Sequence, residues 1–145
     1  MPVTDLQVAT LRAQLAGDLA EHRRLLAALD GEVDGRGYSA LLTAAFHNAV
    51  DLRFTRDSTL GEVTGFVAGV RSRSERLRDA VDPCTAEHVI VAAVGGDYVH
   101  DLDPAESAKM KMFLLAALVA DMHLDEAGLA DFIARARAFA DELLN

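Results

Sequence analysis

The chain has 145 residues, of which 51% are apolar, and a formal net charge of −9. This length is typical of one domain, and the apolar fraction can supply a buried core. The charged fraction of 26% is ordinary and argues against intrinsic disorder. We expect a single helical domain over residues 1–145. A surface this acidic repels phosphate backbones, so we expect no nucleic-acid partner.

The sequence contains no recognisable membrane-spanning or targeting segment. Its longest apolar run, residues 112–120, is far shorter than the ~20 residues that cross a bilayer. The first residues lack the basic flank and apolar stretch of a signal peptide. Cys84 is the only cysteine and cannot form an intramolecular disulfide, which suits a reducing compartment. We expect a cytoplasmic protein with no membrane partner.

Apolar residues recur at helical spacing along the chain, Ala and Leu dominate, and strand patterns are nearly absent. The sequence therefore predicts an all-α fold, a compact bundle of about six helices. The expected helices cover residues 5–29, 38–54, 59–77, 83–94, 104–122 and 125 onward. Residues 112–119 are apolar all round, so the helix near residues 104–122 is expected to be the central one.

Capping signals mark the expected helix starts. Thr4 and Gln7 have the spacing of a capping box, and so do Thr59 and Glu62. Three further starts carry an aspartate at the cap position: Asp82 before Pro83, Asp103 before Pro104, and Asp125.

The order of these features resembles an uncharacterised all-helical protein family of high-GC bacteria. The matching stretches are residues 44–54 (AAF…AV…RF), 62–71, 82–95 and 114–121, which are spread over most of the chain. The resemblance implies a helical fold. Because that family has no assigned activity, it implies no catalytic residue.

Cys84 and His88 are the only candidates for catalysis, and both are weak. Their spacing of four places a thiol and an imidazole on one face at the start of a helix. The pair resembles the Cys-xxx-His end of alkylhydroperoxidase-like helical proteins, which carry a second cysteine three residues earlier. This chain has Val81 there, so the resolving thiol is missing. A structural cysteine beside a surface histidine is the favoured interpretation, and we expect no catalytic residue.

Histidines and acids are frequent, but their spacing does not favour a metal site. Asp18 precedes His22 by four residues and Asp51 follows His47 by four, yet no Glu-x-x-His motif of a carboxylate-bridged bundle occurs. Two acidic loops lie at opposite ends of the expected 104–122 helix. They contain Asp97, His100, Asp101 and Asp103, and Asp121, His123, Asp125 and Glu126. We interpret both loops as solvated helix caps and expect no metal and no cofactor.

The only basic cluster contains Arg71, Arg73, Arg76 and Arg78. Arginines can hold a phosphate. Because Glu75 and Asp79 interrupt the cluster, a salt-bridged helix face is the favoured interpretation.

The first expected helix has a broad apolar face that is a possible interface. Its residues are Val8, Leu11, Leu15, Leu19, His22, Leu26 and Leu29. The face either packs on the bundle or pairs with a second copy or another protein.

The sequence therefore predicts a non-enzymatic cytoplasmic interaction or regulatory domain that self-associates as a homodimer. An alternative is a domain that binds a small apolar ligand in a pocket lined by Phe46, Met110, Phe113 and Met122. A second alternative is a thiol-dependent enzyme at Cys84 and His88.

Overall fold

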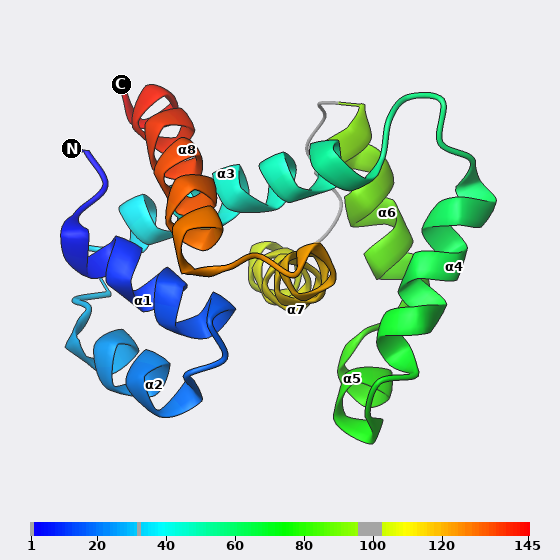
Figure 1. The fold of residues 1–145 in the computed structure, drawn as a ribbon, viewed down its shortest axis with the longest axis horizontal. Coiled ribbons are helices and arrows are strands. Elements are labelled where there is room, and N and C mark those ends of the chain that lie inside the picture. Colours follow the sequence, from blue (N-terminus) through cyan, green and yellow to red (C-terminus); the bar gives the residue numbers. More distant parts are fainter. Residues whose placement is uncertain (1, 32, 96–102) are drawn as a thin grey trace. The chain divides into compact units, whose positions relative to one another are not determined.

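A computed structural model describes residues 2–31, 33–95 and 103–145 (Figure 1). Over these residues the chain forms eight α-helices and no strand. The all-α class is confirmed, whereas the expectation of about six helices was too low. The helices are α1 (Asp5–Leu15), α2 (Leu19–Ala28), α3 (Gly35–Arg53), α4 (Leu60–Arg71), α5 (Glu75–Ala80), α6 (Pro83–Val94), α7 (Pro104–Met122) and α8 (Glu126–Leu144).

The additional helices arise from two breaks that sequence periodicity did not reveal. The first divides the expected 5–29 helix at Gly17, whose φ of +82° lies in the left-handed region that glycine adopts readily. Asp18 then caps α2 by accepting the Glu21 N–H at 3.2 Å. The expectation of one continuous helix over residues 5–29 was therefore wrong.

The second break lies after Arg71, within the expected 59–77 helix. Ser74 accepts the Leu77 N–H at 3.1 Å and so begins the short helix α5. Serine competes with the helix backbone for hydrogen bonds, and for that reason it favours a cap over a helix interior.

The five helix starts that carried an expected capping signal are confirmed, whereas α3 begins at Gly35, three residues before the expected residue 38. Thr4 and Gln7 form the reciprocal capping box of α1, and Thr59 accepts the Glu62 N–H at 3.1 Å. The three aspartates that were expected to cap helices also accept hydrogen bonds from the first turns that follow them: Asp82 from Thr85, Asp103 from Glu106 and Asp125 from Gly128.

The chain divides into two compact units, one of Met1–Ala45 with Val119–Asn145 and one of Phe46–Leu118. Helices α3 and α7 contribute residues to both units. The single domain expected from chain length stays a prediction.

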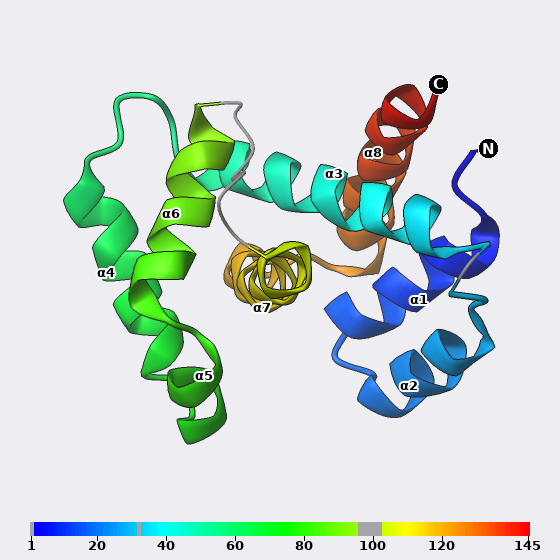
Figure 2. The ribbon, with the colours of Figure 1, turned by 180° about the vertical axis from the view of Figure 1, so that it is seen from behind.

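The first unit contains α1, α2 and α8, and α1 contacts both of the others (Figures 1 and 2). The His22 imidazole joins α2 to α1, because its Nδ1 lies 2.9 Å from the Thr10 carbonyl oxygen. The N-terminal segment is attached to α8 by two residues: Asp141 accepts the Val3 N–H at 2.7 Å, and Arg137 donates to the Val3 carbonyl at 2.8 Å.

In the second unit α4 lies beside α6, and α5 follows α4 directly (Figure 2). Phe54 and Phe66 pack edge to face with their ring centroids 5.7 Å apart, and the Arg53 guanidinium lies 5.1 Å from the Phe54 centroid. The buried apolar side chains of α4 and α6 complete this core: Val63, Phe66, Val67, Val70, Ala86, Val89, Ile90 and Ala93.

Helix α7 has the bounds expected from the sequence. None of its residues 110–119 is exposed, and Leu114 and Leu115 are fully buried. Its central position among the helices stays a prediction. No helix in the described ranges is long and apolar enough to cross a membrane.

Candidate ligand-binding cleft

Cys84 and His88 both lie on α6 and are exposed. The Asp82 carboxylate occupies this helix start: it accepts the Thr85 N–H and the Thr85 hydroxyl, each at 2.9 Å. The hydrogen bond from the Thr85 backbone N–H, followed by that from its side chain, lowers the pKa of Asp82. A carboxylate therefore already uses the donors that a thiolate at this helix start would need.

The seven interface candidates have different environments. Leu11 is fully buried and belongs to the core, so its expected place on an interface is corrected. His22 bonds to Thr10 of its own chain. Leu19 and Leu26 remain on the surface, exposed by 49% and 44%. The other three candidates, Val8, Leu15 and Leu29, are half-buried.

The four expected pocket residues differ in exposure. Phe46 is fully buried and Met110 nearly so, whereas Phe113 and Met122 are half-buried. Their common pocket stays a prediction.

Across residues 2–31, 33–95 and 103–145, no group of three or more His, Cys, Asp or Glu residues could hold a metal ion. Asp97, His100 and Asp101 of the first acidic loop lie outside the described residues.

A cleft of about 420 Å³ lies in the first unit where α7 turns into α8, and we call it the corner cleft. Ten residues line it: Arg12, Leu15, Ala16, Val119, Ala120, His123, Leu124, Asp125, Glu126 and Leu129. They come from the C-terminal end of α1, the last turn of α7, the connection and the first turn of α8.

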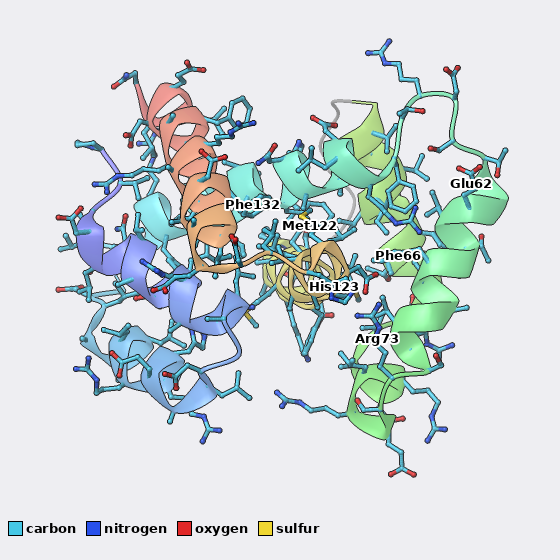
Figure 3. All side chains as sticks on the ribbon, viewed as in Figure 1. Glu62, Phe66, Arg73, Met122, His123 and Phe132 are labelled. Carbon is cyan, nitrogen blue, oxygen red and sulfur yellow. The ribbon has the colours of Figure 1, made fainter. Side chains whose placement is uncertain are left out.

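Three adjacent residues form the corner. His123 follows the last residue of α7 and has a φ of 51°, the left-handed conformation that a residue with a Cβ rarely adopts. Figure 3 shows His123 directly after α7. Asp125 then caps α8 by accepting the Gly128 N–H at 2.7 Å. The Leu124 side chain lies against this first turn, since a Cβ added at Gly128 would be 3.3 Å from it.

Six of the ten residues that line the corner cleft are apolar, and the four polar ones lie at the end of α1, in the connection after α7 and at the start of α8. Arg12 donates to Glu126 at 3.3 Å, and their side chains are 44% and 90% exposed. Because solvent screens such an exposed pair, it contributes little stability and can open at small cost. The volume lies within the range of small-molecule sites, which are mostly apolar with a few polar groups that orient the ligand.

Sequence reasoning did not find the corner cleft. His123, Asp125 and Glu126 were recognised only as a loop of helix caps, and Arg12 lies more than a hundred residues from them in sequence. No protein-family model, curated protein or solved structure matches the chain.

Proposed function

We propose that this chain is a non-enzymatic binding domain that holds a small, largely apolar molecule in the corner cleft. The observation that carries the proposal is the cleft itself, about 420 Å³ lined by Leu15, Val119, Leu124 and Leu129 among others. Burying an apolar ligand against these side chains gains about 25 cal/mol for each Å² removed from water. The single cysteine favours a reducing compartment, so the proposal extends to a cytoplasmic location.

The geometry favours binding over catalysis. The Asp125 carboxylate is engaged as a helix cap, and Glu126 is paired with Arg12. His123 is exposed at the cleft. These groups can orient one polar end of a ligand, while the apolar lining holds the rest of it.

The test uses N-phenyl-1-naphthylamine, a neutral dye whose fluorescence rises in apolar surroundings. Ala120 lines the cleft and is exposed, so Ala120→Phe should fill the cleft without disturbing the core. We expect saturable binding to the native chain and a loss of at least about tenfold in affinity for this variant.

The matched control is Ala134→Phe, which adds the same side chain at an exposed position of α8 away from the cleft. It should bind the dye as the native chain does. Absence of saturable binding to the native chain, or equal binding by native chain and Ala120→Phe, contradicts the proposal.

A second candidate function, self-association through α2, is favoured by a separate observation. Leu19 and Leu26 lie two turns apart on α2, and both are exposed. None of the ten residues of α2 is fully buried, although a helix this short depends on packing for its stability. We propose that a second copy of the chain covers these two leucines in a two-fold pairing.

Sedimentation analysis over a range of protein concentrations tests the pairing. Leu19→Ser with Leu26→Ser should convert the dimer to a monomer. Leu60→Ser removes an exposed leucine of the second unit and should leave the dimer intact. A native chain that sediments as a monomer at every concentration contradicts the pairing.

A further inference from the structure

A second cleft, of about 490 Å³, lies within the second unit between α4 and α5. We call it the arginine cleft, and its lining consists of Ala68, Arg71, Ser72, Ser74, Glu75 and Arg78. It takes no part in the functions proposed above.

The segment that forms the arginine cleft is cationic in an acidic protein. Residues 71–78 contain four arginines and one glutamate, a formal charge of +3, whereas the whole chain carries −9. Figure 3 shows Arg73 in the turn between α4 and α5. Two arginines line the cleft, Arg71 and Arg78. Among the described residues they form one ion pair, in which the Arg78 guanidinium lies 3.8 Å from the Glu75 carboxylate, and these side chains are 58% and 90% exposed. That contact is too long and too exposed to neutralise Arg78.

The Arg71 side chain extends across the cleft, and one of its hydrogen-bond donors has no acceptor. One terminal nitrogen donates to the Arg78 carbonyl at 3.3 Å, so the guanidinium reaches from α4 to α5. Its Nε is shielded from solvent and has no hydrogen-bond partner. A buried donor without an acceptor is unfavourable. An anion that the guanidinium held in a bidentate contact would supply the missing acceptor.

The two serines add neutral polar groups beside the arginines. The Ser74 hydroxyl accepts the Leu77 N–H, which leaves its own proton available for donation. The Ser72 hydroxyl donates to the Gly69 carbonyl at 2.7 Å. The cleft therefore combines two guanidinium groups with a hydroxyl donor, a set that suits an oxyanion.

We propose that the arginine cleft binds the phosphate group of a small phosphate-bearing molecule. Two guanidinium groups match the charge of a phosphate dianion, and their planar forks match its oxygens. The dianion displaces the Glu75 carboxylate from Arg78. A small ligand is favoured over a nucleic acid or an anionic membrane, because the acidic remainder of the surface repels extended polyanions.

Calorimetric titration with inorganic phosphate and with pyrophosphate, at constant ionic strength, tests this inference. Arg78→Gln should weaken binding about tenfold, the equivalent of one lost charge-assisted hydrogen bond. Arg71→Lys keeps the charge but removes the bidentate contact, and should also weaken binding. Glu75→Gln removes the competing carboxylate and should strengthen binding.

Arg76→Gln is the matched control, since Arg76 is exposed in the same cationic segment but does not line the cleft. If Arg76→Gln and Arg78→Gln weaken anion binding equally, the effect comes from the overall positive charge of the segment. That result overturns the inference. Absence of heat from both anions overturns it as well. Arg78→Gln and Glu75→Gln change exposed side chains, so both variants keep the test informative if Arg71→Lys does not fold.

Discussion

The corner cleft and the arginine cleft each lie beside a turn between two helices, yet they differ in chemistry. A side-chain oxygen begins the second helix in both cases, from Asp125 in the corner cleft and from Ser74 in the arginine cleft. The corner cleft is lined mainly by leucine, valine and alanine, whereas arginine and serine line the other. The same local turn chemistry therefore lies beside a cleft with mainly aliphatic residues in one unit and beside a cleft with two arginines in the other.

The two turns also differ in what anchors the helix that follows. Helix α8 has nineteen residues and buries Leu129, Phe132 and Ile133 in the first unit. Helix α5 has six residues and none of them is buried. The corner cleft thus depends on the core of its unit, whereas the arginine cleft depends on local contacts such as that of Arg71 with the Arg78 carbonyl.

The largest expected effect tests whether the two clefts share one cooperative structure. Leu115 is fully buried in α7, a helix that contributes to both units, and Leu115→Asp places an unpaired charge there. We expect a loss of about 4 kcal/mol or more, which unfolds the chain in one transition as a single domain would. Circular dichroism in urea measures this loss. Leu60→Asp, at an exposed position, should leave stability nearly unchanged.

A Leu115→Asp variant that still binds N-phenyl-1-naphthylamine saturably contradicts this expectation. The first unit would then hold the corner cleft without the second, and the single-domain prediction would be wrong.

The next effect compares the two caps directly. Asp125→Ala should cost about 1 kcal/mol in urea unfolding, the usual value for a lost N-cap, because α8 carries buried residues of its unit. Ser74→Ala should shift the global transition less, since α5 buries nothing, and should instead increase amide exchange within α5. Equal global losses for the two variants would show that α5 is as strongly coupled to the core as α8.

A smaller effect of opposite sign is expected at His123. Its left-handed backbone is unfavourable for a residue with a Cβ, so His123→Gly should stabilise the chain by about 0.5–1 kcal/mol after the entropy cost of glycine. The same change at His88, inside α6, should destabilise by about 0.3–0.5 kcal/mol, the difference in helix propensity between the two residues. Urea midpoints give both values. Destabilisation by His123→Gly would show that the imidazole contributes more to the corner than its strained backbone costs.

Local sequence signals predicted the helix class and most helix starts, because a cap and its helix lie within four residues of each other. Thr4 with Gln7 and Asp82 with Pro83 are such cases. The breaks at Gly17 and Ser74 were missed because the apolar periodicity continues across them. The arginine cluster of the second unit was recognised but interpreted as a salt-bridged helix face, whereas the corner cleft was missed because it depends on how the chain folds back on itself. Arg12 and Leu129 meet at the corner cleft only through the packing of α1 near α8.

The smallest expected effect distinguishes the histidines of the two units. His123 is exposed in the first unit, whereas His47 is half-buried in the second. Burial lowers the pKa of His47 below 6.5, Lys111 lowers it further, and Asp51 partly opposes them. As pH falls below 6.5, the unfolded chain takes up a proton on His47 that the folded chain does not. Stability from this residue is therefore full above pH 6.5 and declines as pH falls through the lowered pKa.

Urea unfolding between pH 7.5 and pH 5 measures that decline, and His47→Gln should reduce its slope. His88→Gln, at an exposed position of α6, is the matched control. If the slope is the same in His47→Gln as in the native chain, or if His88→Gln reduces it equally, the decline does not originate at His47. A slope that depends on His47 alone would locate the acid sensitivity of the fold in the second unit and outside both clefts, because His47 lines neither of them.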